Sequence, residues 1–265
     1  MARLESDFKI LNREFKQLKI MKNYYFAFVI FAGSLFLFNS CEKDDLNTDD
    51  DISIEEKYQN AIKDAMIAEQ SEISHKLIAI NDTNTYITRT GTDPNTKILV
   101  ITWTKYPGSF PEDSTITNNW GELWVTVVPE LEDWFESNYT IGSDFILRAE
   151  QLLGLPANKG YTSFVELWVK PEDLLRPSPD SEITDNIAQL DFPANADSNY
   201  KIWFNDNIIN SYYPMRYPWT RLGYTYDWGN SKSEIGLSEF IIRKNSLITV
   251  HNVSDNASFF NSNED

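Results

Sequence analysis

An uncharged apolar run of 13 residues, Phe26–Phe38, decides which part of this chain is expected to fold. A helix needs roughly 20 apolar residues to cross the hydrocarbon core of a bilayer, so the run is too short to span one. Its length suits the apolar segment of a secretory signal peptide, and Met21 and Lys22 precede it as a short positive segment. Ser40 stands directly before Cys41, the only cysteine, as a small residue stands before a cleavage site. We therefore expect the residues before Cys41 to be removed.

The segment MKNYYFAFVIFAGSLFLFNSC, residues 21–41, resembles the signal of a bacterial lipoprotein of the Bacteroidota type. The resemblance implies that Cys41 carries lipid and begins the mature chain, anchored at the outer membrane and either facing the periplasm or exposed on the cell surface. Phe38 and Asn39 depart from the usual pattern, in which an aliphatic and a small residue are commonest. Residues 1–20 are expected to be an over-extended start, since Met21 can itself be the first residue of the signal. The alternative is that the apolar run is a buried core helix. The acidic residues that directly follow Cys41 fit this alternative poorly.

The mature chain, residues 41–265, is strongly acidic. Six of the 23 basic and three of the 40 acidic residues lie in the leader, which leaves 17 and 37 and a formal net charge of −20. Such a surface repels the phosphates of nucleic acids and the headgroups of anionic lipids. We therefore expect no nucleic-acid partner and expect membrane contact only through the lipid on Cys41.

The charge pattern divides the mature chain into a tether, a domain and a tail. Residues 42–56 hold eight acids and one lysine, and like-charge repulsion keeps such a run extended. Residues 41–56 are therefore predicted to be a flexible acidic tether, although an acidic stretch after a lipidated cysteine also resembles a surface-export signal. Residues 57–253 are predicted to form one globular domain, and residues 254–265 a polar tail.

Periodicity and turn residues predict the elements of the domain. Helices are expected at 53–70, with Ser53 and Glu56 as a capping box, from Pro129 onward, at 143–153 and at 199–209. Strands are expected at 76–80, 85–90, 97–104, 121–128, 163–170, 224–228, 236–242 and 247–253, the last two as a closing hairpin. Strands in adjacent runs around two consecutive helices do not follow βαβ alternation. We therefore predict an α+β fold: a predominantly antiparallel sheet with helices packed on one face.

The densest aromatic stretch is YPWTRLGYTYDWG, residues 217–229. In a strand, Tyr224, Tyr226 and Trp228 would share one face and form a platform suited to stacking on sugar rings. The predicted binding residues are Trp219, Arg221, Tyr224, Tyr226 and Trp228. The alternative, which is the more frequent role of such rings, is that they fill the core between the sheet and the helices.

The histidine and cysteine content limits the chemistry. His75 and His251 are the only histidines, and the one thiol is assigned to lipid. A cysteine nucleophile is therefore excluded, a His/Cys zinc site is not expected, and a Ser-His-Asp triad would need one of these two histidines. The glycines do not have the spacing of phosphate-binding or dinucleotide motifs. We expect neither a cofactor nor a metal.

Four segments, residues 147–156, 166–177, 217–229 and 236–240, resemble those of a group of uncharacterised bacterial proteins of unknown function. The resemblance brings no activity with it. The composition then favours a non-catalytic binding or scaffold lipoprotein that recognises a glycan or a partner protein. The alternative is a carboxylate-dependent hydrolase, in which two acids about 5 to 10 Å apart act together, one with a raised pKa. Its candidate residues are Glu166, Asp227 and Glu239.

Overall fold

The computed structural model describes residues 52–139 and 143–261, which belong to one compact unit. The predicted signal peptide, the over-extended start and Cys41 lie outside the described residues, as do residues 42–51 of the tether and 262–265 of the tail. Within the described ranges, no helix combines the length and the apolar composition needed to cross a membrane.

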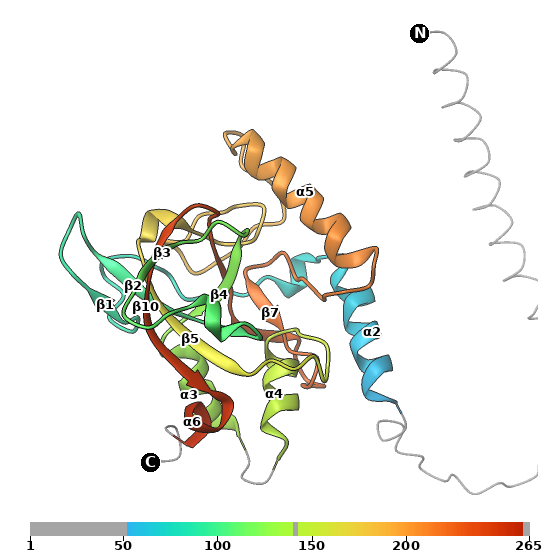
Figure 1. Cartoon of the computed structure of the whole chain (residues 1–265). Helices are drawn as coiled ribbons and strands as arrows, with labels where there is room; N and C mark the ends of the chain where they lie inside the picture. The colour runs from blue at the N-terminus through green and yellow to red at the C-terminus, as the bar shows by residue number, and fades with distance from the viewer. Residues whose placement is uncertain (1–51, 140–142, 262–265) are drawn as a thin grey trace, which may run out of the picture. The chain divides into compact units, whose positions relative to one another are not determined.

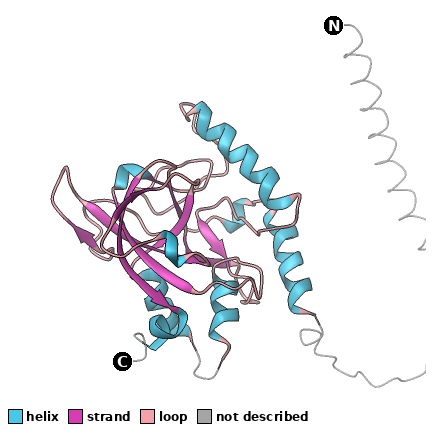
Figure 2. Ribbon diagram, in the orientation of Figure 1, coloured by secondary structure: helices cyan, strands magenta, loops and turns pink. Residues whose placement is uncertain are grey.

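The domain is built on an eight-stranded sheet in the order β3-β10-β5-β2-β4-β9-β6, with β1 paired to β2 (Figures 1 and 2). Its strands are β1 (Arg89–Thr90), β2 (Lys97–Thr104), β3 (Thr115–Thr117), β4 (Leu123–Val127), β5 (Ser163–Val169), β6 (Leu174–Leu175), β9 (Phe240–Ile242) and β10 (Leu247–Asp255). A smaller sheet pairs β7 (Tyr224–Tyr226) with β8 (Ile235–Ser238). Every described strand pair is antiparallel, which confirms the predicted α+β class.

β2 lies in the middle of the sheet and is buried on both faces, as its continuous apolar sequence predicts. Ile98 and Val100 belong to one core cluster, and Leu99, Ile101 and Trp103 to another. The two sets alternate because successive side chains of a strand point to opposite faces. The sheet therefore separates two cores.

Five helices complete the described domain: α2 (Ile54–Ala65), α3 (Glu130–Asn138), α4 (Phe145–Leu152), α5 (Ser198–Tyr212) and α6 (Asn256–Asn261). α3, α4 and α6 gather on one side of the sheet (Figure 1) and contribute to the second core. α2 and α5 supply a third cluster, in which their aromatic side chains meet Trp219 and Trp228. The space between the second and third clusters is where the candidate site lies.

Local signals set the helix ends. The Ser53 hydroxyl accepts a hydrogen bond from the Glu56 N–H at 3.1 Å, so α2 begins at the predicted cap, inside the segment assigned to the tether. Pro129 precedes α3 as predicted. α4 begins at Phe145, two residues after the expected start, because the side chain of Asp144 caps it by accepting the N–H of Leu147 at 3.0 Å.

The predicted closing hairpin is wrong. β9 pairs with β4 and β6, whereas β10 pairs with β5 and β3, so the two strands that the short turn joins belong to opposite ends of the sheet. Residues 76–80 form no strand, and the N–H groups of Leu77 and Ile80 bond to the loop carbonyls of Asn186 and Ile183. Only Arg89–Thr90 of the expected strand at 85–90 pairs.

The segment predicted to be a polar tail is folded from Ser254 to Asn261, as far as it is described. β10 continues to Asp255, and α6 follows it. Phe259 stacks on Phe164 with ring centroids 4.0 Å apart, and the Trp103 indole N–H donates to Asn256 at 2.8 Å. Phe259 and Phe260 stand in an otherwise polar segment, which is why the sequence predicts a polar tail.

Candidate functional site

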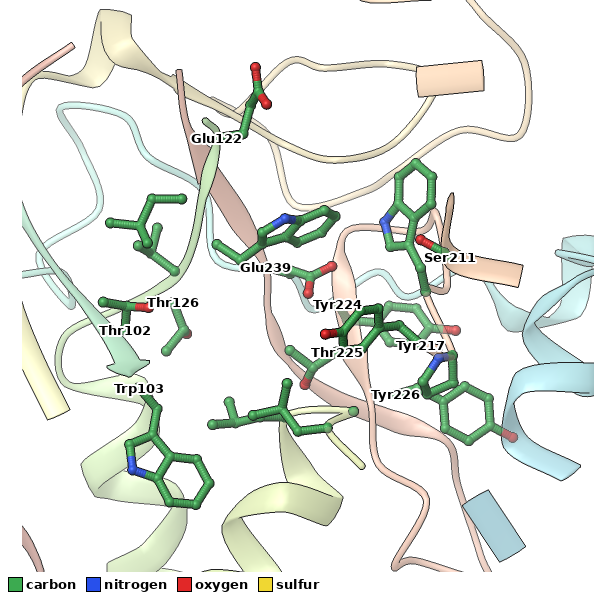
Figure 3. A pocket seen from close by; sticks show the side chains of 18 of the residues that line it. Thr102, Trp103, Glu122, Thr126, Ser211, Tyr217, Tyr224, Thr225, Tyr226 and Glu239 are labelled. Atoms are coloured by element: carbon green, nitrogen blue, oxygen red, sulfur yellow. The ribbon is translucent and has the colours of Figure 1, made fainter. Parts of the chain in front are cut away.

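A pocket of about 400 Å³ opens where the sheet meets the ends of α4 and α5 and the small sheet (Figure 3). Ligand pockets span about 300–1,000 Å³, so the volume suits a small organic ligand. Its lining comes from β2, β4, β7, the turn after α4, α5 and the segment that follows α5. These segments are far apart in the sequence, and only the fold brings them together.

The strand period of two places the side chains of β4 in the pocket. Val125 and Val127 point into the first core, so Trp124 and Thr126 point to the opposite side and line the pocket. The Trp124 ring meets the Trp219 ring edge to face, with centroids 5.8 Å apart and an interplanar angle of 85°. The two indoles form an aromatic wall held by packing from both sides.

The pocket has a buried bottom and an exposed mouth. Ile101, Tyr224 and Thr225 are buried, whereas Arg216 and Tyr217 of the lining are exposed. Tyr217 is 41% exposed, so an aromatic face is available at the mouth. A ligand would therefore pass an aromatic rim before it reached the bottom.

Glu239 places a carboxyl group inside this pocket. It lies between β8 and β9, where its N–H donates to the Gly223 carbonyl at 2.9 Å and fixes the backbone. Its side chain points into the pocket (Figure 3), and the carboxyl group has no hydrogen-bond or ion-pair partner among the described residues. Burial raises its pKa from the ordinary value of 4.5 to about 8, so the group is mainly protonated at neutral pH.

Glu130 provides the contrast, because its buried carboxylate is fully occupied by the protein. It accepts the Ser238 N–H at 3.0 Å, the Ser238 hydroxyl at 2.9 Å and the Thr126 hydroxyl at 3.0 Å. These bonds join α3 to β8 and β4, so Glu130 has a structural role. Glu239 lacks such bonds, which leaves its carboxyl group available to a ligand.

Two further lining residues carry buried nitrogen atoms without a partner in the described part of the chain. They are Nδ2 of Asn207 on α5 and Nε1 of Trp219. An unsatisfied buried N–H costs about 1–3 kcal/mol, so proteins rarely leave several in one place. With the half-buried carboxyl group of Glu239, which has no partner among the described residues, three polar groups of the lining lack a partner in the protein.

Three of the five predicted binding residues, Trp219, Tyr224 and Tyr226, line the pocket. They do not form the exposed platform considered above. Tyr224 is 1% exposed and its hydroxyl donates to the Glu72 carbonyl at 2.9 Å, while the Tyr226 hydroxyl donates to the Asp64 carboxylate at 2.7 Å. A register shift between Tyr224 and Tyr226 breaks the regular alternation.

Trp228 and Arg221 lie outside the pocket lining. The Trp228 indole N–H donates to the Leu155 carbonyl at 3.0 Å, and its ring meets that of Tyr58 edge on with centroids 5.5 Å apart. Arg221 donates to the Met66 carbonyl at 2.9 Å and lines a separate, smaller hollow. Both residues tie α2 to the rest of the domain.

The structure does not bring the three predicted acids together. Asp227 is 2% exposed and is held by Arg148 through two bonds of 2.8 and 2.6 Å. Glu166 lies on β5, 3.9 Å from Nε2 of His251, and burial raises its pKa. Neither acid lines the pocket that holds Glu239. A second lining acid, Glu122, directs its carboxylate away from the pocket (Figure 3).

Sequence reasoning missed Trp124, Thr126 and Asn207. The alternation of β4 is a signal for the first two, because a tryptophan and a threonine opposite two buried valines are poorly explained by one core. Asn207 carries no local signal, since asparagine is common on exposed helix surfaces.

Among residues 52–139 and 143–261, no three His, Cys, Asp or Glu side chains come together in a group that could hold a metal ion. Comparisons with protein-family models, with curated proteins and with solved structures find no match to this chain.

Proposed function

We propose that the domain is a non-catalytic binding module and that its pocket holds a sugar residue of a glycan. The observation that carries the proposal is the unpartnered carboxyl group of Glu239 inside an aromatic-walled pocket of about 400 Å³. Binding pockets combine mostly apolar walls with a few polar groups that fix the orientation of the ligand.

The chemistry of a sugar matches this combination. The C–H faces of a sugar ring pack against aromatic rings, here those of Trp124, Trp219 and Tyr217, while its hydroxyl groups need hydrogen-bond partners. The protonated carboxyl group of Glu239 supplies a donor and an acceptor. A ligand hydroxyl at this position would bond to a group that has no partner among the described residues.

The hydrolase alternative is less well supported. A glycosidase needs a second carboxyl group about 5 to 10 Å from the first to act as a base or nucleophile. Glu239 is the only described acid whose side chain both lines the pocket and points into it, because Glu122 points away. Binding requires no second acid, and we therefore favour it.

The proposed location is the outer membrane, with lipid on Cys41 as the anchor and the acidic tether between the lipid and the domain. The apolar run and the cysteine in the sequence support this proposal. Replacing Cys41 with Ala is expected to abolish lipid labelling and to release the protein from the membrane fraction. A Cys41→Ala variant that stays membrane-bound would contradict the anchor without affecting the pocket.

A glycan array tests the binding proposal, with Tyr217→Ala and Tyr213→Ala as matched variants. Both tyrosines are exposed, at 41% and 77%, but only Tyr217 lines the pocket. We expect the wild type and Tyr213→Ala to bind the same glycans, and Tyr217→Ala to bind them about tenfold more weakly, which corresponds to about 1.4 kcal/mol of lost stacking. Binding that is equal in the two variants would place the ligand elsewhere, and absence of any bound glycan would refute the proposal.

A further inference from the structure

We infer that the ligand group that reaches Glu239 is an ammonium group, so that the sugar bound in the pocket is an amino sugar. The inference rests on the proposed function and narrows its ligand class. Three properties of the pocket support it: the charge of its lining, the aromatic walls and the charge of the surrounding domain.

The inner part of the pocket has one acid and no cation among the described residues. Apart from tyrosines, the ionisable groups of the lining are Glu122, Arg216 and Glu239. Arg216 is exposed at the mouth and Glu122 points away, so Glu239 is the group whose charge a ligand would meet (Figure 3). Tyr212 also lies within electrostatic range, since Glu239 contributes to the raised pKa of its hydroxyl, and it is neutral at neutral pH. Arg216, which is exposed, is therefore the one cationic side chain among the described lining residues.

The aromatic walls also favour a positively charged ligand. The faces of Trp and Tyr rings attract cations, and this attraction grows when water is excluded. Trp124 and Trp219 line the pocket with Tyr217 at its mouth. The aromatic side chains of the lining therefore favour a cationic ligand over an anionic one.

The whole domain adds a long-range attraction. Residues 52–261 hold 16 basic and 29 acidic residues, a formal net charge of −13. Such a charge raises the local concentration of cationic ligands and lowers that of anionic ones. A carboxylate-bearing sugar is therefore disfavoured, whereas an amino sugar is favoured over its neutral counterpart.

Binding of a cation should also be accompanied by the release of a proton. Glu239 is mainly protonated at neutral pH, and an ammonium group beside it stabilises the ionised form. Binding must then release the carboxyl proton into the buffer. A neutral sugar that accepts the Glu239 proton in a hydrogen bond releases none, which separates the two ligand classes.

Calorimetry with D-glucosamine and D-glucose tests the inference, because these sugars differ by an ammonium in place of a hydroxyl group. At pH 7 we expect wild type to bind glucosamine at least tenfold more tightly than glucose, and to release a net of more than about half a proton, because the part of the free sugar that is unprotonated takes one up; the dependence of the heat on buffer ionisation measures this release. Glu239→Gln should remove both the preference and the release, and Glu136→Gln, at an exposed acid of α3 outside the lining, should keep both. Circular dichroism and urea unfolding establish that each variant is folded.

Tetramethylammonium, whose charge does not titrate, provides a second probe that is independent of sugar binding. Its affinity for wild type should rise about ninefold between pH 6 and pH 7 and level off above pH 8, and should not depend on pH in Glu239→Gln. Equal affinities for glucose and glucosamine would overturn the inference while leaving a sugar site. Tetramethylammonium binding without sugar binding would refute the proposed function but not the ammonium site. If Glu239→Gln bound both glucosamine and tetramethylammonium with wild-type affinity, the inference would be overturned.

Discussion

The ion pair between Arg148 and Asp227 gives a sharp test of whether Asp227 is structural. Asp227 is 2% exposed, whereas Arg148 is 22% exposed and its guanidinium lies 4.4 Å from the centre of the Trp134 ring. Arg148→Ala leaves a buried carboxylate with only the Gly229 N–H, at 3.2 Å. Asp227→Ala leaves a guanidinium that reaches water and still contacts Trp134. The two substitutions should therefore lower the free energy of unfolding by unequal amounts.

The magnitudes follow from the burial of each partner. Breaking a buried ion pair costs about 3–5 kcal/mol, and we expect about 3 kcal/mol for Arg148→Ala because one backbone bond to Asp227 remains. Asp227→Ala should cost about 1–2 kcal/mol, because its stranded partner is partly hydrated. The loss of unfolding free energy in the double variant should be smaller than the sum of the losses in the two single variants.

Urea unfolding followed by tryptophan fluorescence measures these free energies. Lys170→Ala is the matched control, because the Lys170–Glu172 pair has a similar distance of 3.1 Å but side chains that are 41% and 72% exposed. It should change the free energy of unfolding by no more than about 0.5 kcal/mol. A loss under about 1 kcal/mol for Arg148→Ala, the size of an exposed pair, or a larger loss for Asp227→Ala, would refute the reasoning.

Three further predictions concern the tail, a glycine and the pocket acid. Phe259→Ala should lower the free energy of unfolding by about 3 kcal/mol through lost stacking on Phe164, whereas a loose tail would tolerate it. Gly223→Ala should lower it by more than about 1 kcal/mol, because φ is +73° and the new Cβ would lie 2.7 Å from Arg176 Cδ; an unchanged urea midpoint would contradict this close packing. Folded Glu239 keeps a proton that the unfolded chain gives up above pH 4.5, so wild-type stability should fall relative to Glu239→Gln as pH rises from about 4.5 to 8; parallel stability curves would contradict the raised pKa.

Local patterns in the sequence were sufficient for the elements but not for their arrangement. The continuous apolar run of β2 predicts a central strand, and Ser53 and Pro129 predict helix starts, because each signal acts within a few residues. The pairing of β9 and β10 is decided by strands far away in the sequence, which place Val125 opposite Phe240 and Leu167 opposite Val250, so the short turn between β9 and β10 predicts the wrong partner.

The candidate site was only partly predictable for the same reason. Trp219, Tyr224 and Tyr226 of the aromatic stretch line the pocket, but the sequence did not indicate that the hydroxyl groups of Tyr224 and Tyr226 would bond to Glu72 and Asp64. Glu239 was one of three acids that the sequence could not separate. Its distinction is the absence of a partner in the described structure, which depends on the positions of every neighbouring side chain.

Two substitutions on α5 test most directly that the pocket is the binding site. Asn210 and Asn205 are both exposed, but only Asn210 lines the pocket. A tryptophan at position 210 should obstruct the mouth, whereas the same residue at position 205 should not. Calorimetric titration with the strongest glycan from the array should give unchanged affinity for Asn205→Trp and a loss of more than about tenfold for Asn210→Trp. Wild-type affinity in Asn210→Trp would contradict the account.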